Sequence, residues 1–362
     1  MSPLCLRLGV AGVVILAALV LSPAGASSAA VTTPRLGSHA MIDPSMSPDT
    51  VDALFAATKR AHLGSVRLDI PAALQFPNAP APADWKTLDV YRAAARKHRL
   101  EVLGVMYGTP WWLANCPPGA KEFYRCPPID YVAWKKLVRQ IAAHAPEVGY
   151  WEILNEANLP DAYFYGDAVE YARFLRVTSA GLRAGNPKAK IVFSGVLAPY
   201  RDWLDKVLSQ PGTMAAFDIA NAHFRGGVGK LDEMVRQARG QFAYYGFTGP
   251  LWVSEMGYTS DPVWQYIPGF LGGNAATGLK SQARYLRRAM PVLLRSGASR
   301  VFLTLRDLDT QWGIFTSEGL LQWPVPLPKP AYRVVRHFAK RVATGAWPPA
   351  RRGSAPRCAV RT

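Results

Sequence analysis

One stretch decides how this chain is expected to fold: Tyr150-Trp151-Glu152-Ile153-Leu154-Asn155-Glu156-Ala157-Asn158. Its apolar residues predict a buried β-strand, which ends at the polar pair Asn155-Glu156. A carboxylate at the end of a buried strand is costly unless it has a partner. Glu156 is therefore either a solvated loop residue, as a single Glu usually is, or one member of a polar site.

A second stretch has the same plan: Leu251-Trp252-Val253-Ser254-Glu255-Met256-Gly257. It is an apolar run that closes on a Glu and is followed by Gly. Two strand-terminal carboxylates about 100 positions apart suggest a pair that faces across one site, and hydrolysis of a glycosidic bond needs such a pair.

The rest of the chain alternates between short apolar segments and helical ones. The expected strands are Leu36–Ile42, Gly64–Ile70, Glu101–Tyr107, the opening stretch, Ile191–Gly195, Phe217–His223, Leu251–Glu255 and Val301–Leu305. The expected helices are Pro48–His62 with Ser47 as N-cap, Asp84–His98, Asp130–His144, Asp167–Ala184, Arg201–Ser209, Leu231–Tyr245, Leu279–Leu294 and Pro330–Thr344. Strict alternation predicts an α/β fold, a single-domain (β/α)8 TIM barrel over residues 31–345, with a doubly wound sheet as the second choice.

In such a barrel the chemistry lies at the C-terminal ends of the strands. Glu156 and Glu255 fall at two of these ends. The other polar residues expected there are Arg67, Asp69, Asn221, His223, Arg306 and Asp307.

Both ends of the chain are predicted to lie outside the barrel. Residues 1–30 carry Arg7, a run of roughly 14 apolar residues and small residues such as Ser28-Ala29-Ala30, which is typical of a cleavable signal peptide. The protein is therefore expected to be secreted, with an uncleaved N-terminal anchor as the alternative. The basic tail, residues 346–362, is rich in Pro, Arg and Ala and is expected to be disordered.

Cysteine use agrees with export. Cys116 and Cys126 flank a Pro-rich loop and are expected to form a disulfide, which in a short loop contributes roughly 2–3 kcal/mol. Cys5 belongs to the signal segment, and Cys358 has no obvious partner in the tail.

The net charge of the chain is +17, and its Lys and Arg are spread over the predicted helices. This indicates a basic outer surface that favours an anionic cell envelope or an acidic polymer. Nucleic acid is not an expected partner, because no nucleic-acid motif is present and the chain is expected to be exported. The His residues show no HExxH or similar spacing, so neither a metal nor another cofactor is expected.

The strand-four stretch resembles a motif of the clan A glycoside hydrolases, which are retaining β/α-barrel enzymes, and is closest to family 39 and its relatives. In that motif the Glu after Asn is the general acid/base, which implies this role for Glu156. The clan's nucleophile ends strand seven, where Glu255 stands. The resemblance also matches Arg67, beneath the nucleophile, and His223, at the end of strand six. One departure is Ala157, where the clan usually has Pro.

The segments near the end of the domain look familiar as well. They are Leu303-Thr304-Leu305-Arg306-Asp307, Gly319-Leu320-Leu321 and Lys329-Pro330-Ala331-Tyr332. The resemblance thus extends over roughly residues 36–344.

A retaining enzyme of this kind would use ionised Glu255 as nucleophile and protonated Glu156 as acid and then base, with no cofactor. Asn155 would donate a hydrogen bond to the sugar hydroxyl beside the anomeric carbon. Asn221 and His223 would orient a carboxylate or a sugar hydroxyl, and Tyr258 would orient Glu255. The candidate sugar-stacking platforms are Trp111, Trp112, Trp264 and Trp312.

Each assignment has a structural alternative. Arg67 would otherwise form an ion pair with Asp69 or another neighbour, and His223 would be a buried core histidine. Each Trp taken singly is more often a packing residue. The leading function is hydrolysis of O-glycosidic bonds in a polysaccharide or oligosaccharide. The alternatives are a barrel that binds envelope polysaccharide without cutting it, and a transglycosylase with the same carboxylate pair. The sequence gives no indication of the sugar, the linkage or the oligomeric state.

Overall fold

The computed structural model describes residues 35–347 apart from 80, 160–161, 199, 262–276 and 309–314. The predicted signal peptide, the tail beyond residue 347, Trp264 and Trp312 lie outside the described residues. The described part belongs to one compact unit, Thr32–Thr362. Among its helices, none has the length and apolar character that crossing a bilayer requires.

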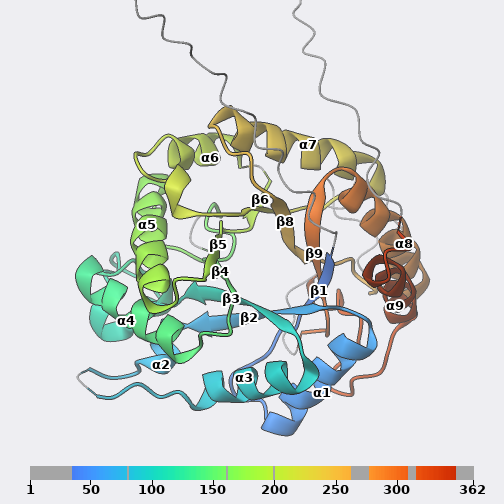
Figure 1. Ribbon diagram of the computed structural model, residues 1–362, viewed down its shortest axis with the longest axis horizontal. Helices are drawn as coiled ribbons and strands as arrows, with labels where there is room; N and C mark the ends of the chain where they lie inside the picture. Colours follow the sequence, from blue (N-terminus) through green and yellow to red (C-terminus); the bar gives the residue numbers. More distant parts are fainter. Residues whose placement is uncertain are drawn as a thin grey trace, which may run out of the picture. The chain divides into compact units, whose positions relative to one another are not determined.

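Nine parallel strands form one curved sheet in the order β5-β4-β3-β2-β1-β9-β8-β7-β6 (Figure 1). The strands are β1 (Arg35–His39), β2 (Ser65–Pro71), β3 (Glu101–Tyr107), β4 (Tyr150–Ile153), β5 (Lys190–Val192), β6 (Val196–Leu197), β7 (Ala220–His223), β8 (Leu251–Met256) and β9 (Ala298–Thr304). The first and last strands of the chain, β1 and β9, are neighbours, so the two ends of the domain meet in the sheet.

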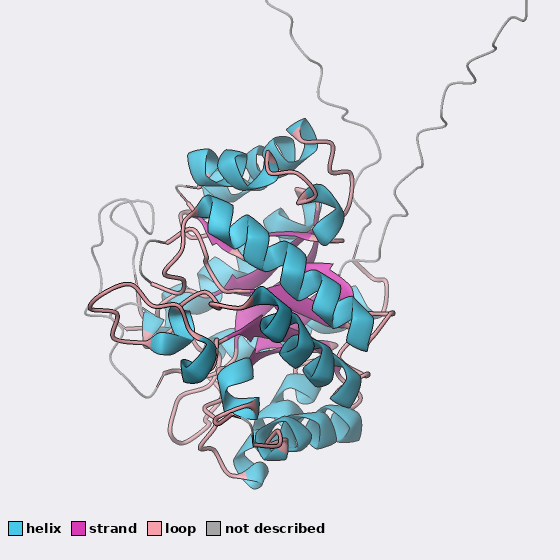
Figure 2. Ribbon diagram, turned by 90° about the vertical axis from the view of Figure 1, so that its left-hand side faces the viewer, coloured by secondary structure: helices cyan, strands magenta, loops and turns pink. Residues whose placement is uncertain are grey.

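Helices cover the outside of this sheet (Figure 2). They are α1 (Pro48–Arg60), α2 (Ala72–Gln75), α3 (Lys86–His98), α4 (Tyr131–His144), α5 (Ala168–Gly185), α6 (Arg201–Leu208), α7 (Val228–Tyr244), α8 (Leu279–Arg295) and α9 (Pro330–Ala343). Strands and helices alternate as predicted except at two places, where the short helix α2 precedes α3 and where β6 follows β5 directly. The Ser47 side chain accepts from Thr50 N at 3.2 Å, which confirms the predicted N-cap.

The expected fifth strand, Ile191–Gly195, is wrong as one continuous element. The structure has two short strands, β5 and β6, separated by three residues. The backbone between them is drawn toward the end of β4, because Gly195 N donates to Glu152 Oε1 at 3.2 Å and Gly195 O accepts from Glu156 N at 3.1 Å. A side-chain carboxylate thus takes a backbone hydrogen bond that a regular strand would use in its ladder.

The end of the sheet where the strands begin is filled by apolar and aromatic side chains. Trp252 and Phe302 pack there with Leu103, and Tyr150 packs against this cluster. The Arg300 guanidinium lies 4.9 Å from the centroid of the Tyr150 ring and 4.3 Å from that of Trp252. This end is therefore closed, and the polar side chains gather where the strands end.

Candidate active site

The β4 stretch places a fully buried carboxylate, Glu152, beneath the polar pair that follows it. Arg67 on β2 neutralises this carboxylate through two hydrogen bonds, Nε to Oε2 at 2.8 Å and Nη2 to Oε1 at 3.0 Å. Arg67 thus pairs chiefly with Glu152, while its Nη1 also lies 3.4 Å from Glu255 Oε2. The sequence placed Arg67 beneath the nucleophile, with an ion pair to Asp69 or another neighbour as the alternative. Arg67 Nη2 also donates to Asn155 Oδ1 at 2.6 Å, which turns the Asn155 amide nitrogen away from the arginine.

Strand β4 ends in an uncommon backbone conformation. Leu154 and Glu156 have positive φ angles of 64° and 41°, in the left-handed region that non-glycine residues rarely adopt. Backbone hydrogen bonds hold both residues, Leu154 N to Met106 O and Glu156 N to Gly195 O, each at 3.1 Å. Strain of this kind gathers at functional sites, where surrounding contacts maintain it. Here it turns the side chain of Glu156 into the space above the strand ends.

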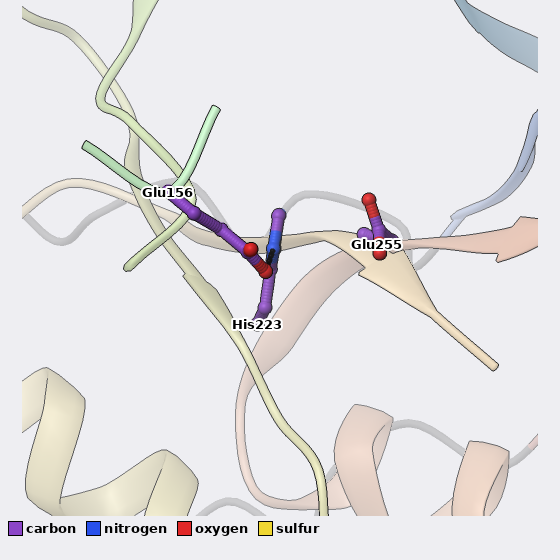
Figure 3. Close-up of side chains that lie close together, drawn as sticks. All are labelled: Glu156, His223 and Glu255. Atoms are coloured by element: carbon purple, nitrogen blue, oxygen red, sulfur yellow. Dashed lines mark hydrogen bonds and ion pairs between the residues drawn. The ribbon is translucent and has the colours of Figure 1, made fainter. Parts of the chain in front are cut away.

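Glu156 and Glu255 lie close together at this end of the sheet, and the carboxylate of Glu156 points toward His223 (Figure 3). One carboxylate oxygen from each residue and one ring nitrogen of His223 all lie within 4.8 Å of one another. The Glu156 side chain is 9% exposed and that of Glu255 is 17% exposed, so both are reachable from solvent but mostly enclosed. The structure therefore brings together the two carboxylates that the sequence placed at separate strand ends.

Glu255, on β8, is surrounded by cationic and hydrogen-bonding groups. Arg225 Nη2 donates to Oε1 at 2.6 Å, while Arg67 Nη1 and His39 Nδ1 lie 3.4 and 3.3 Å from Oε2. Burial acts to raise the pKa of Glu255, but the hydrogen bond from His39 and the charges of His223, Arg225 and His39 hold it well below its usual range. Glu255 is thus kept ionised, as a nucleophile or base must be.

Glu156 makes one short contact, from Oε1 to His223 Nδ1 at 2.7 Å. His223 is fully buried, and its other nitrogen, Nε2, lies 2.8 Å from Ser254 Oγ. Gly195 leaves room for this imidazole, because a Cβ there would collide with the ring. His223 therefore orients a carboxylate, which is one of the two roles expected for it.

The hydrogen bonds around Ser254 fix the proton on His223. Ser254 N donates to Asn221 Oδ1 at 3.1 Å, so the Asn221 amide nitrogen is the group that donates to Ser254 Oγ at 2.8 Å. Ser254 Oγ gives its own proton to Glu152 Oε1 at 3.0 Å. It can only accept from His223 Nε2, which must carry a hydrogen. Glu156 and His223 Nδ1 then share a single proton.

Asn221 differs from its expected position. It is fully buried, and its amide bonds to Ser254 and to Phe193 O, at 3.1 Å, leave it no group to offer a substrate. It supports Ser254 and is a positioning residue.

Tyr258 is also placed differently from the expectation. Its ring stacks on Tyr285 of α8, with ring centroids 4.1 Å apart. In the described part of the chain, the hydrogen bonds and ion pairs of Glu255 come from Arg225, Arg67 and His39.

The predicted aromatic platforms begin just after β3. Trp111 is 59% exposed and donates from Nε1 to Pro77 O at 2.9 Å, whereas Trp112 donates to Phe76 O at 3.1 Å and packs on the core. The structure has a disulfide between Cys116 and Cys126 that closes the following loop. Trp111 thus keeps a large exposed surface on an anchored indole, and stacking of a sugar on it stays a prediction.

The sequence analysis did not assign a role to His39, Glu152 or Ser254, and it also missed Arg225, Tyr163 and Glu318. Arg225 follows His223 by two positions and so faces the same side of the chain, a signal that was present. The pKa of Tyr163 is raised, first by burial and then by the charges of Glu156 and Glu255. Glu318, beyond β9, has no sequence pattern that marks it.

Glu156, His223 and Glu255 are also residue types that bind metal ions. Each of the three is already engaged, Glu255 by Arg225 and Glu156 by His223, and two arginines supply positive charge. An ion would have to displace these contacts to bind here.

The fold of the chain is similar to the folds of several solved glycoside hydrolases. It is similar to a family 39 glycoside hydrolase from the gut symbiont Bacteroides cellulosilyticus WH2, with 17% identity, a TM-score of 0.62 and coverage of 85% of this chain and 63% of that chain. It is also similar to a GH39 β-xylosidase from Caulobacter crescentus, with 16% identity, a TM-score of 0.63 and coverage of 86% and 71%. A third similar structure is GH5_18 from Streptomyces cattleya in complex with GlcNAc, with 16% identity, a TM-score of 0.62 and coverage of 90% of this chain and 83% of that chain.

These comparisons confirm the predicted resemblance at the level of the fold. The chain spans less than two thirds of the length of the first of these structures. No family model and no curated protein matches the sequence. The roles of individual residues therefore rest on the geometry of the site.

Proposed function

We propose that this protein is a retaining glycoside hydrolase in which Glu255 is the nucleophile and Glu156 the general acid/base. The observation that carries the proposal is the approach of the two carboxylates, with oxygens within 4.8 Å. Retaining enzymes hold their carboxyl groups about 5–5.5 Å apart, whereas inverting enzymes leave roughly 6.5–9.5 Å for a water molecule. The separation favours the retaining reaction.

In the first step, an oxygen of Glu255 attacks the anomeric carbon and the bond to the leaving oxygen breaks. Glu156 gives its proton to that oxygen, and an ester joins the sugar to Glu255. In the second step, water attacks the anomeric carbon, Glu156 takes the water's proton, and Glu255 leaves as a carboxylate. His223 holds Glu156 in place and shares its proton through the bond to Nδ1.

Asn155 is suited to recognise the sugar hydroxyl next to the anomeric carbon. Its Oδ1 accepts from Arg67, so its amide nitrogen is the group left to donate to a substrate. Asn155 remains partly exposed, unlike the buried residues around it. A hydrogen bond from this group strengthens as charge develops in the transition state.

The substrate class that we propose is an oligosaccharide or polysaccharide with O-glycosidic bonds. The similar solved structures include a β-xylosidase and an exo-β-1,4-mannosidase, so β-xylosides and β-mannosides are the first substrates to try. A panel of plant, fungal and bacterial glycans, with products identified by mass spectrometry, extends the search.

The test replaces the two carboxylates one at a time. We expect Glu255→Ala and Glu156→Gln each to lower kcat at least about 10³-fold on a natural glycan. Azide should partly restore a Glu156→Ala variant on a substrate with an activated leaving group. Glu233→Gln, on the outer face of α7, is the matched control and should keep full activity.

The result also separates the alternatives. Glycan binding without product on any substrate would identify a polysaccharide-binding barrel. Products with new linkages would identify a transglycosylase. Full activity of either catalytic variant would contradict the assignment.

The proposal includes a closed (β/α)8 barrel as the catalytic domain, over residues 31–345, with β5 and β6 acting as one strand. A parallel bridge from Val192 to Ile219, and the hydrogen bond from Phe193 N to Ile219 O at 2.9 Å, support closure at that point. A crystal structure would test it.

We also propose that the protein is exported after removal of residues 1–30, with the basic chain favouring an anionic envelope. The Cys116–Cys126 disulfide supports an oxidising compartment. Mass spectrometry of the N-terminus of the protein from culture medium and from membranes distinguishes cleavage from an uncleaved anchor.

A further inference from the structure

Arg225 lies between two carboxylates of the site. Its Nη2 donates to Glu255 Oε1 at 2.6 Å, and its Nη1 lies 3.1 Å from Glu318 Oε2. The side chains of Arg225 and Glu318 are each 3% exposed. One buried cation is therefore shared by the proposed nucleophile and by a second carboxylate that solvent barely reaches.

Glu318 is built into the wall of the site. Gly257, two residues after Glu255, leaves room for it, because a Cβ at Gly257 would collide with the Glu318 carboxyl group. Gln282 Nε2 on α8 donates to Glu318 O at 3.1 Å and fixes the backbone. Within the part of the chain that the structure describes, Glu318 Oε1 is buried and has no hydrogen-bond partner. Glu318 thus acts through Arg225 and is a positioning residue.

The groups that face Glu318 determine its charge. Burial raises its pKa to about 7, Arg225 opposes that rise, Glu255 and Glu156 add to it, and Lys329 opposes it. The Tyr285 hydroxyl is also close enough for its pKa to respond to Glu318. The negative charges of Glu255 and Glu156 both disfavour ionisation of Glu318. A change in the charge of either residue therefore changes how readily Glu318 ionises.

We propose that Arg225 shifts between its two partners during the catalytic cycle, an exchange in which Glu255 and Glu318 share it in the free enzyme and Glu318 holds it while Glu255 is esterified. This inference rests on the proposed function. Formation of the ester removes the Glu255 charge next to Arg225, so the buried cation then needs an ionised Glu318 as its anion. Glu318 supplies that anion, and any proton that it held passes to solvent. When water releases the sugar, the Glu255 carboxylate re-forms and Arg225 returns to it.

The exchange makes an ionised Glu318 useful in the first step. A negative Glu318 draws Arg225 partly away from Glu255, so the Glu255 carboxylate is less stabilised and more reactive. When Glu255 is esterified, the same negative charge neutralises the positive charge of Arg225. Glu318→Gln removes both effects. Below the neutral range the wild-type residue is itself protonated and resembles glutamine, so the variant and the wild type should converge there.

The experiment measures kcat/KM against pH for the full-length wild type and for Glu318→Gln on an aryl glycoside. We expect the wild type to exceed the variant about tenfold at about pH 8 and less than about twofold at about pH 5.5. Glu318→Asp keeps an ionisable group and should retain the pH dependence, which provides a second measurement if the Gln variant folds poorly.

Glu147→Gln is the matched control, because it removes a partly buried carboxylate that pairs with Arg92 of α3 at 2.6 Å, without touching Arg225 or any group that faces Glu318. Its ratio to the wild type should not vary with pH. A Glu318→Gln ratio that is the same at every pH, in an enzyme that Glu255→Ala inactivates, would overturn the partner exchange alone. Full turnover by Glu255→Ala would instead overturn the proposed function.

Discussion

His223 Nδ1 lies 2.7 Å from Oε1 of Glu156, and Ser254 determines that the other ring nitrogen of His223, Nε2, carries a hydrogen. Because Ser254 Oγ donates to Glu152, it forces His223 Nε2 to be a donor. The proton that Glu156 shares with His223 therefore depends on the hydroxyl of Ser254. Ser254 lies on another strand and does not contact Glu156.

Ser254→Ala should therefore weaken the acid/base function without removing any group that contacts the sugar. We expect kcat to fall about tenfold, with a changed pH profile, because His223 is no longer held in one tautomer. The matched control is Thr178→Val, which removes a buried hydroxyl bonded to Trp134 Nε1 at 2.7 Å, away from the site. Both variants should lose about 1–2 kcal/mol of unfolding free energy, but only Ser254→Ala should change the pH profile of kcat.

Asn155→Asp should distinguish the two hydrogen bonds assigned to this side chain, the one that Oδ1 accepts from Arg67 and the one that the amide nitrogen donates to the sugar. The aspartate still accepts from Arg67, but it no longer offers a donor to the sugar. We expect kcat/KM to fall about 10²–10³-fold on a glycoside with a hydroxyl beside the anomeric carbon. On the matching 2-deoxy glycoside, the variant and the wild type should be nearly equal. An equal loss on both substrates would contradict the role given to the amide.

The buried pair Arg67–Glu152 should dominate the stability of the site. Arg67→Met leaves the Glu152 carboxylate buried and uncompensated, so we expect a loss of about 3–5 kcal/mol in unfolding free energy, measured with denaturant. The double variant Arg67→Met/Glu152→Gln should recover part of it. By contrast, Arg236→Met breaks an exposed pair with Asp232 on α7 and should cost less than about 0.5 kcal/mol.

Glu318 should make stability depend on pH. Its folded-state pKa is raised to about 7, so the folded protein holds this proton more tightly than the unfolded chain does. The resulting stability is present below the unfolded pKa and is lost as pH rises through about 7, by on the order of 3 kcal/mol. Glu318→Gln should therefore melt higher than the wild type at about pH 8 and similarly at about pH 4. A variant that melts lower at the higher pH would contradict this.

The positions of most strands and of both carboxylates could be predicted because they depend on local pattern. Apolar runs such as Leu251–Val253 are buried wherever the chain places them, and a Glu that ends such a run lies at the rim of the sheet. The fifth strand could not be predicted correctly, because its interruption depends on the capture of Gly195 N by Glu152, which is 43 residues away in sequence.

Polar residues inside the sheet were harder to assign. Asn221 and His223 lie on the same face of β7, two positions apart, and the sequence treats them alike. Asn221 lies deeper in the sheet, and its amide group is fully hydrogen-bonded to Ser254 and Phe193. His223 lies nearer the strand ends and forms a hydrogen bond with Glu156. The depth of a residue within the sheet depends on how its strand is shifted along the neighbouring strands. The sequence pattern of a single segment does not determine that shift.

By itself, the sequence determined the alternating fold, the strand ends that carry Glu156 and Glu255, and the residue types around them. Only the tertiary structure decided which cation serves which carboxylate: Arg67 for Glu152, and Arg225 shared between Glu255 and Glu318. The physical reason is that charge interactions in a buried site depend steeply on distances of a few ångströms between groups from different strands. No spacing along the chain encodes those distances.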